Sequence, residues 1–412
     1  MRSTVIEPFF ATSQRLIART RTAFTRFLFA QIDWRQPLIV LVGMRGVGKT
    51  TLLLQHLKNT FGVGSQGLYI SADDVNLSGL RLVDIAKEFT EKFAGKTLVL
   101  DEIHKYPNWN QELKNIADSY PDLKVIASGS SSLDILKGQY DLSRRSLVYE
   151  LPQLSLREFI NFSLDIHLEA HKLNDVLRNH PALAAGITEE LQKKNVTALE
   201  RFNHYLDYGA YPYFQNKEVE DFYRQVVNAV NKVIYEDISS SFNTSAQAAP
   251  TLQRLLNLLT SSEPFEPNVD AIARNLGIAR DTTYNYLDYL EKSGLTRHLQ
   301  PSGSGARAVR KPAKIYLANP TLYNALGQIK GLEVKRGTLR ESFFLSQLQN
   351  LYKVTGHEAR DFVIHSKPAI TFEVGGRGKS REVLTENTYL AVDDLIYGVG
   401  QTIPLWLFGF LY

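Results

Sequence analysis

The sequence predicts an α/β fold: a parallel sheet near the start of the chain, then a helical region and two smaller units. Residues 1 to about 150 alternate short apolar runs with segments of helical periodicity, which is typical of a parallel sheet with helices on both faces. From about residue 155 to 240, tyrosine and phenylalanine recur at helical spacing. Because ligands bind at the carboxyl ends of parallel strands, we expect the functional site at that edge.

The composition is that of a globular protein. The 412 residues suffice for about two to four domains of roughly 150 residues, and the apolar fraction of 44% leaves enough material for a core. The absence of cysteine excludes disulfides and thiolate zinc sites and favours a cytoplasmic location. No run approaches the roughly 20 apolar residues that span a bilayer, so we expect no membrane partner. The net charge of +4 permits nucleic-acid binding without requiring it.

A glycine-rich segment directly follows the first apolar run, Pro37–Val42. Its glycines let successive backbone N–H groups turn inward around a phosphate, and the helix that begins at Thr51 points its positive end at the same place. Lys49 would contact the β- and γ-phosphates, and the Thr50 hydroxyl would bind Mg²⁺. The predicted nucleotide-binding residues are Gly43, Arg45, Gly46, Val47, Gly48, Lys49, Thr50 and Thr51. This segment predicts a P-loop that binds a nucleoside triphosphate.

Two further strands end in polar side chains. The run Thr97–Leu100 leads into Asp101, which would hold Mg²⁺, and Glu102, which would orient the attacking water. The run Leu123–Ser128 leads into Ser130, which is either a sensor of the γ-phosphate or a helix N-cap. The sequence has no Asn-Lys-x-Asp motif for reading guanine. We therefore expect ATP with Mg²⁺ and an ATPase reaction at the β–γ phosphoanhydride.

These motifs are similar to those of a prokaryotic family of predicted AAA+ superfamily ATPases joined to a C-terminal domain of unknown function. The resemblance is carried by residues 43–50, 100–109, 127–132, 142–145, 151–159, 208–212 and 314–317. It implies an AAA-type core, homo-oligomers, and winged-helix and restriction-endonuclease-like parts in the C-terminal half. It also implies that Arg145 is an arginine finger directed at a neighbouring subunit. Arg144 stands where family members usually carry glycine, so either arginine is a candidate.

The ends of the core carry features that we interpret structurally. Four arginines near the N-terminus are expected on a helix that packs on the core with a solvated basic face: Arg15, Arg19, Arg21 and Arg26. His167, Glu169 and His171 are expected on a solvated helix rather than in a metal site, because Glu169 lies on another helix face. The polar segment 239–249 is expected to be a linker. The predicted domains are 1–154, 155–245, 246–330 and 331–412.

Residues 246–330 have the pattern of a winged helix. Helices are expected at 250–260, 269–276 and 278–293, followed by strands 295–300 and 314–318 around a turn at 302–305. The third helix would bury Thr283, Tyr286, Leu287 and Leu290. Its outer face and the basic hairpin supply the nucleic-acid candidates Arg280, Tyr284, Asn285, Arg297, Arg307, Arg310, Lys311 and Lys314. A winged helix also serves as a protein-contact module, so DNA and a protein partner both remain candidates.

The C-terminal carboxylates have the order of a restriction-endonuclease-like domain. Glu341 lies on a predicted helix at 339–351, and Asp361 and Glu373 flank strand-like runs. Gly375 stands where that pattern needs lysine, and Arg377 or Lys379 could substitute. We expect an inactive relative of such nucleases. The apolar segment 404–412 is expected to be a buried strand.

The sequence thus predicts an AAA-type ATPase that couples Mg²⁺-dependent ATP hydrolysis to contacts made by its C-terminal domains, with DNA as the favoured partner. The first alternative is a slow nucleotide-gated switch or scaffold that recruits proteins. The second is a metal-dependent nuclease that uses the C-terminal carboxylates.

Overall fold

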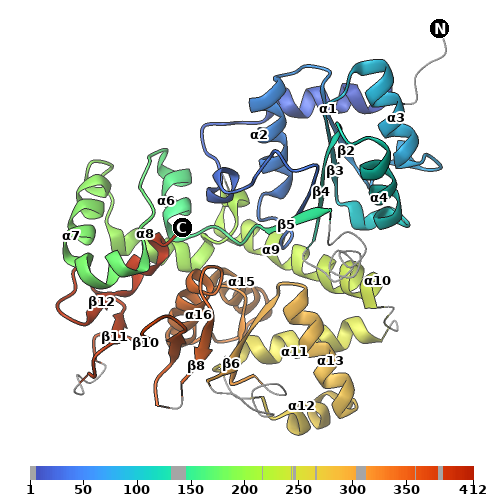
Figure 1. Ribbon diagram of the computed structural model, residues 1–412. Helices are drawn as coiled ribbons and strands as arrows, with labels where there is room; N and C mark the ends of the chain where they lie inside the picture. The colour runs from blue at the N-terminus through green and yellow to red at the C-terminus, as the bar shows by residue number, and fades with distance from the viewer. Residues whose placement is uncertain are drawn as a thin grey trace. The chain divides into compact units, whose positions relative to one another are not determined.

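The computed structural model describes residues 6–130, 145–215, 217–242, 244, 247–264, 267–302, 312–357, 359–378 and 384–412. The chain forms two compact units, Met1–Pro152 and Gln153–Tyr412 (Figure 1). The further division of the second unit at residues 245 and 330 stays a prediction. In the described residues, no helix combines the length and apolar character that crossing a membrane requires.

The first unit is built on a five-stranded sheet with the order β2-β3-β4-β1-β5, in which every neighbouring pair is parallel. This confirms the predicted parallel sheet. Helix α2 lies on one face, and α3 and α4 lie on the other (Figure 1). Its elements are α1 (Glu7–Arg19), η1 (Phe27–Ala30), β1 (Leu38–Val42), α2 (Lys49–Phe61), β2 (Gly67–Ser71), η2 (Val75–Leu77), α3 (Leu82–Phe93), β3 (Thr97–Asp101), η3 (Ile103–Lys105), α4 (Trp109–Ser119), β4 (Lys124–Gly129) and β5 (Ser146–Glu150).

The apolar core of this unit is formed by residues at helical spacing in the helices and by alternate residues in the strands. Helix α3 buries residues at positions i, i+3, i+4 and i+7, namely Leu82, Ile85, Ala86 and Phe89. Alternate strand residues face this helix and α4 in one apolar cluster, because successive strand side chains point to opposite faces. Each fully buried leucine, isoleucine or phenylalanine contributes about 1.5–3 kcal/mol. The cluster thereby fixes the strand register, and the register aligns the carboxyl ends of β1, β3 and β4.

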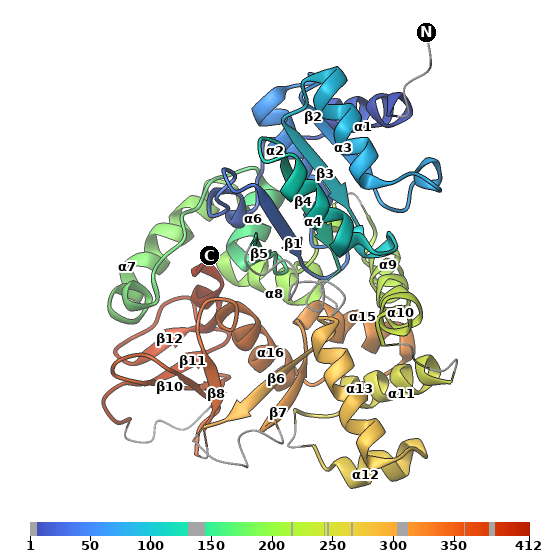
Figure 2. The same ribbon diagram turned by 45° about the vertical axis from the view of Figure 1, so that its right-hand side comes forward.

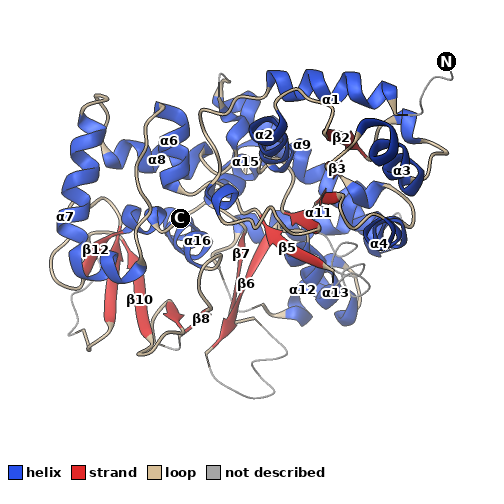
Figure 3. Ribbon diagram, turned by 45° about the horizontal axis from the view of Figure 1, so that its top comes forward, coloured by secondary structure: helices blue, strands red, loops and turns tan. Residues whose placement is uncertain are grey.

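The second unit combines helices with a seven-stranded mixed sheet of order β12-β11-β10-β9-β8-β6-β7 (Figure 2, Figure 3). Helix α16 packs against β10 and the terminal η6 in its apolar core. The helices are α6 (Leu156–Leu164), α7 (Leu173–Gln192), α8 (Ala198–Tyr208), η4 (Pro212–Phe214), α9 (Val219–Lys232), the π-helix η5 (Val233–Ile238), α10 (Ser239–Phe242), α11 (Ala248–Ser261), α12 (Val269–Leu276), α13 (Arg280–Lys292), α15 (Pro320–Lys330), α16 (Arg336–Leu348) and η6 (Leu405–Phe410). The strands are β6 (Thr296–Pro301), β7 (Lys314–Leu317), β8 (Val354–Gly356), β9 (Phe362–Ile364), β10 (Ile370–Gly375), β11 (Thr388–Val392) and β12 (Thr402–Pro404).

The three helices and the strand pair expected in residues 246–330 are present as α11, α12, α13, β6 and β7. Helix α13 buries Thr283, Leu287 and Leu290, while Tyr286 is only partly buried. Strand β6 also pairs in parallel with β8, so this hairpin belongs to the C-terminal sheet. One sheet therefore crosses the expected boundary at residue 330. The winged-helix and nuclease-like assignments stay predictions.

The expected linker 239–249 is helical at both ends, in α10 and at the start of α11. Two further local predictions were wrong. The terminal segment is buried, but Leu405–Phe410 form the 3-10 helix η6 rather than a strand. Residues there are uniformly apolar, so their periodicity could not distinguish the two. Helix η6 lies so close to α6 that a Cβ on Gly409 would be 2.4 Å from the Leu156 Cβ.

The second error concerns the pair of histidines. Residues 166–172 form no helix, because α6 ends at Asp165 in the left-handed conformation (φ 50°). The Asn161 amide then bonds both backbone groups of Leu168, at 2.9 and 3.0 Å, and holds the segment in a loop. His167 is exposed and pairs with Glu169 at 2.9 Å.

A buried carboxylate connects α16 to the end of β11. The Asp393 side chain is 1% exposed and accepts from Arg340 Nε at 2.7 Å and Arg336 Nε at 3.0 Å. Burial alone would raise the pKa of Asp393, but the two guanidinium groups and the Asp394 N–H outweigh it, so the pKa lies below its ordinary value. Ionised Asp393 therefore stabilises the second unit.

We expect Asp393→Asn to destabilise the second unit by about 3 kcal/mol at neutral pH, since it leaves two arginines without their buried partner. Because the folded pKa is depressed, this contribution is complete above the unfolded pKa of about 3.9 and is lost as pH falls through the folded pKa. Denaturant titrations of both proteins across this range measure it. Asp394→Asn, at a residue whose side chain is 53% exposed, is the matched control. A penalty that does not change with pH would contradict the assignment.

Candidate functional site

Glycine is required in the loop between β1 and α2 by its backbone. Gly43 has φ 152° and Gly48 has φ 101°, in a region that residues with a Cβ rarely adopt. A Cβ on Gly43 would also lie 2.5 Å from the Leu151 carbonyl oxygen. Gly48 is the N-cap of α2 and has no side chain to cap the first turn. The first turn of α2, at the positive end of its dipole, therefore has no side-chain cap and suits an anion.

Lys49, the first residue of α2, is buried inside this loop. Its side chain folds back so that Nζ donates to the Gly43 carbonyl at 2.7 Å and to the Met44 carbonyl at 3.2 Å. The residue is 5% exposed. The ammonium group is thus held at the glycine-rich loop, and its contact with phosphates stays a prediction.

Asp101, at the end of β3, accepts hydrogen bonds from several elements of the first unit. It is 2% exposed. Its Oδ2 accepts from the Thr50 hydroxyl at 2.6 Å and the Tyr69 hydroxyl at 2.8 Å. Its Oδ1 accepts from the Ser128 hydroxyl and from the Glu102 N–H at 3.1 Å. Since Thr50 directs its proton at Asp101, the lone pairs of its oxygen remain available for a cation.

Tyr69 and Ser128 were not among the predicted site residues. Tyr69 comes from β2 and Ser128 from β4, the two strands that flank β3. Burial, followed by the Asp101 carboxylate, raises the pKa of Tyr69 well above its ordinary value. The phenol therefore stays protonated and keeps donating to Asp101. Only the strand order, which a single sequence does not contain, brings these hydroxyls to the carboxylate.

Glu102 follows in a strained backbone conformation, with φ 52° and ψ 38°. Its N–H is fixed by Asp101 Oδ1 and lies 3.4 Å from Ser128 Oγ. Its carboxylate Oε2 lies 3.5 Å from Arg45 Nη1 and 3.7 Å from His104 Nε2, and it has no hydrogen bond to any residue that the structure describes. The loop arginine Arg45 and the glutamate are thus brought together.

Ser130 lies just beyond β4, which runs in register beside β1 from Leu38–Val125 to Val42–Gly129. It is 3% exposed, and its hydroxyl has no hydrogen-bond partner among the described residues. An unsatisfied buried hydroxyl costs about 1–3 kcal/mol unless a ligand or water satisfies it. This orphaned hydroxyl at the same sheet edge fits a bound phosphate. Residues Ser131 and Ser132 lie outside the described part of the chain.

Arg26 is a further residue that the sequence did not point to. All four arginines were expected on the solvated face of a helix, which is correct for exposed Arg15 and Arg19 on α1. Arg21 is exposed but lies beyond the end of α1, and Arg26 is neither on that helix nor exposed. Arg26 is 5% exposed, and its guanidinium donates to the Val47 carbonyl at 2.5 Å and to the Pro152 carbonyl at 2.7 Å. It therefore supports the glycine-rich loop from outside.

The arginine-finger candidate Arg145 immediately precedes β5. Its guanidinium pairs with Asp118, at the end of α4, through contacts of 2.8 and 3.4 Å. Both side chains are substantially exposed, at 38% and 48%. Arg144 lies outside the described residues. The intersubunit role of Arg145 stays a prediction.

The nucleic-acid candidates in the second unit fall into two groups. On α13, Arg280 and Asn285 are exposed, and the Arg280 guanidinium lies 5.9 Å from the Tyr284 ring centre. Arg297, in contrast, donates to Ala318, Gln349, Gln153 and Asn350. Its guanidinium is engaged inside the unit, which does not favour a phosphate contact. Arg307, Arg310 and Lys311 lie outside the described residues.

Lys314 is engaged too, by the C-terminal carboxylates. Its Nζ lies 2.9 Å from Glu341 Oε2 and 3.4 Å from Asp361 Oδ1. Burial lowers the pKa of Lys314, but the two carboxylates outweigh it and raise the pKa overall, so the lysine stays charged. Glu373 pairs with Arg360.

Of the two proposed lysine substitutes, Arg377 donates to the Asp394 carbonyl at 2.6 Å, and Lys379 lies outside the described residues. In the described part of the chain, no three His, Cys, Asp or Glu side chains are placed to hold a metal. Each of the three acids instead faces a cationic side chain, which does not favour metal-dependent cleavage.

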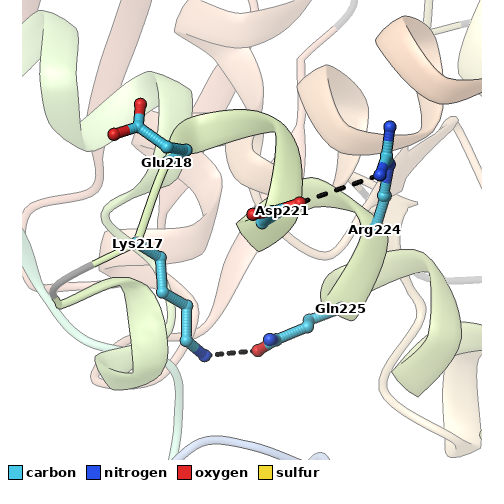
Figure 4. A pocket seen from close by; sticks show the side chains of 5 residues that line it. All are labelled: Lys217, Glu218, Asp221, Arg224 and Gln225. Atoms are coloured by element: carbon cyan, nitrogen blue, oxygen red, sulfur yellow. Dashed lines mark hydrogen bonds and ion pairs between the residues drawn. The ribbon is translucent and has the colours of Figure 1, made fainter.

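The second unit also has a surface hollow of about 660 Å³ beside the start of α9 (Figure 4). It is lined by Lys217, Glu218, Asp221, Arg224 and Gln225. Lys217 bonds Gln225, and Arg224 lies 3.8 Å from Asp221, so these side chains pair with one another. The hollow contains none of the predicted site residues.

Comparisons with known proteins find matches to segments of both units. Residues 35–160 match a family model described as an AAA domain, and residues 199–333 match a domain of unknown function (DUF8612). An uncharacterized protein of Methanocaldococcus jannaschii is 29% identical over 376 residues, covering 85% of this chain and 78% of that protein. A second one from that organism is 24% identical over 270 residues, covering 62% and 55%.

Among solved structures, AMPPCP-bound DnaA from Aquifex aeolicus is 15% identical, with a TM-score of 0.25, and the match covers 71% of this chain and 89% of that one. The family match, the parallel sheet and the glycine-rich loop together support a P-loop core of the AAA type in the first unit.

Proposed function

We propose that this chain is an ATPase that hydrolyses the β–γ phosphoanhydride of ATP with Mg²⁺. The observation that carries the proposal is the convergence of Lys49, Thr50, Asp101 and Glu102 at the aligned carboxyl ends of β1 and β3. The orphaned Ser130 hydroxyl adds an independent reason to expect a ligand at that edge. A sheet edge with these groups fits a triphosphate and its cation.

Each residue of the site would have a distinct role in ATP hydrolysis. The loop N–H groups and Lys49 bind the phosphates, and the Thr50 hydroxyl and Asp101 hold the cation. Mg²⁺, when bound, would neutralise charge on the β- and γ-phosphate oxygens. Glu102 orients the attacking water and accepts its proton, and Ser130 donates to a γ-phosphate oxygen. In a homo-oligomer, Arg145 would exchange Asp118 for the γ-phosphate of the next subunit.

Glu102→Gln is expected to retain ATP binding but to lower kcat about 100-fold or more, since it removes the base without changing the side-chain shape. Isothermal titration with a non-hydrolysable ATP analogue and a phosphate-release assay measure the two effects. Glu91→Gln, the same change at an exposed position of α3, is the matched control. Undiminished turnover in Glu102→Gln would refute the role of Glu102.

Tyr69→Phe is expected to raise the Mg²⁺ concentration for half-maximal turnover by about 10-fold, because outer partners of metal ligands typically contribute that much to affinity. Its loss leaves Asp101 Oδ2 with the Thr50 hydroxyl alone among the contacts described above. Magnesium titrations of ATP turnover test this. Tyr106→Phe, which removes a hydroxyl bonded to the Leu80 carbonyl at 2.9 Å, is the control. An identical Mg²⁺ requirement in all three proteins would contradict the role.

We further propose that ATP turnover is coupled to contacts of the second unit with DNA. The supporting observation is α13, on which Arg280 and Asn285 are exposed and the Arg280 guanidinium lies 5.9 Å from the ring centre of partly buried Tyr284 and 3.5 Å from exposed Asp270. Guanidinium and aromatic side chains side by side suit both phosphate and base contacts. A protein partner on the same face is the rival, and it corresponds to the slow switch or scaffold.

Gel-shift titrations with single-stranded, duplex and branched DNA separate the two partners. Arg280→Ala is expected to weaken binding to every DNA form and to lower the slope of log affinity against log salt by about 1. Lys292→Ala, which removes one positive charge at the other end of α13, is the control. If no form of DNA binds to the wild-type protein, the DNA proposal is refuted, and a protein partner on this face becomes the favoured hypothesis.

A further inference from the structure

Arg45 and Glu102 face each other at the nucleotide site although they come from different elements. Arg45 lies on the glycine-rich loop, and Glu102 follows β3. Their side chains are 15% and 16% exposed, with Nη1 and Oε2 3.5 Å apart. At this burial, the attraction between opposite charges is stronger than between two solvated side chains.

We propose that Arg45 is a positioning residue that holds the Glu102 carboxylate until a γ-phosphate displaces it. The inference rests on the proposed ATPase function, which it deepens by adding a switch. In the absence of a γ-phosphate, Arg45 pairs with Glu102. When ATP enters the loop, the Arg45 guanidinium turns to the γ-phosphate, and Glu102 is released to orient water.

The charges favour this exchange. A terminal phosphate carries more negative charge than one carboxylate and offers several oxygens, which a planar guanidinium can contact with two parallel N–H groups. The present pair is a single 3.5 Å contact through Nη1. ADP brings no γ-phosphate to the loop. The competition between Glu102 and phosphate for Arg45 therefore distinguishes ATP from ADP.

The surroundings of Glu102 confine the change to its side chain. Its backbone N–H is held by Asp101 Oδ1 at 3.1 Å, so the strained main chain stays in place. His104 Nε2 lies 3.7 Å from Glu102 Oε2, and the His104 side chain is 5% exposed. Because His104 belongs to η3 and not to the loop, it remains beside the carboxylate when Arg45 leaves. Glu102 would then rotate within a small range.

A double-mutant cycle tests the competition. Affinities for a non-hydrolysable ATP analogue and for ADP, each with Mg²⁺, are measured in the full chain for four proteins: wild type, Glu102→Gln, Arg45→Ala and the double variant. Removing the Glu102 charge removes a competitor for Arg45, so Glu102→Gln should bind the ATP analogue about fivefold more tightly than wild type. In the Arg45→Ala background the same change should have almost no effect. ADP affinity should not respond to it in either background.

Two control variants separate competition for Arg45 from a general change in charge near the site. Asp73→Asn removes one negative charge after β2, where Asp73 pairs with Lys105 at 2.7 Å, and it should not tighten the ATP analogue. Arg45→Lys keeps the positive charge without the planar fork, so Glu102→Gln should have an intermediate effect in that background. This second background also serves if Arg45→Ala folds poorly.

Equal tightening by Glu102→Gln with and without Arg45, or equal tightening for ADP, would overturn the switch. Tightening by Asp73→Asn as large as that by Glu102→Gln would do so too, since simple charge repulsion would then account for both effects. Failure of the wild-type chain to bind any nucleotide would instead refute the proposed ATPase function. The two failures are therefore distinguishable.

Discussion

The nucleotide site depends on the buried carboxylate of Asp101. Its two oxygens accept from Thr50 on α2, Tyr69 on β2, Ser128 on β4 and the backbone of Glu102. A carboxylate that is 2% exposed is tolerated only when its lone pairs are satisfied in this way. The bonds in turn require three neighbouring strands to end at the same height. The apolar side chains that fix the register of the sheet thereby also fix the geometry of the cation ligands.

Much of the site could be predicted from the sequence because its signals are local. Gly43, Gly48, Lys49 and Thr50 lie within eight consecutive residues, and each has a chemical reason for its position. Arg26 shows the limit of such reasoning. It bonds carbonyls 21 and 126 positions away, and nothing in its own neighbourhood distinguishes it from the exposed arginines beside it. Tyr69 escaped prediction for the same reason, since its partner is 32 positions away.

The partners of the basic side chains in the second unit could not be predicted from the sequence. The basic residues between 295 and 331 suggested a surface for phosphates, yet Arg297 and Lys314 are bound by acceptors inside the unit. Lys314 sits between Glu341 and Asp361, which come from residues 27 and 47 positions later in the chain. Residues 295–331 contain six lysines and arginines and no acidic residue. This composition does not reveal that the parallel pairing of β6 with β8 joins the hairpin to the sheet that carries the acids.

The acid cluster of the second unit and the sheet edge of the first unit differ in how their polar side chains are satisfied. In the second unit, Lys314 neutralises two carboxylates and Arg360 neutralises Glu373, so the cluster is complete within the chain. In the first unit, the Ser130 hydroxyl and one oxygen of Glu102 are buried without hydrogen bonds among the described residues. Leaving such groups unsatisfied costs free energy, and a ligand or a moving side chain at this edge would recover it. Both lie at the sheet edge that carries Lys49 and Asp101. Unsatisfied buried groups also occur in the second unit, for example the Tyr213 hydroxyl. The sheet edge of the first unit differs because its unsatisfied groups lie beside Lys49 and Asp101, which favours that edge over the acid cluster as a ligand site.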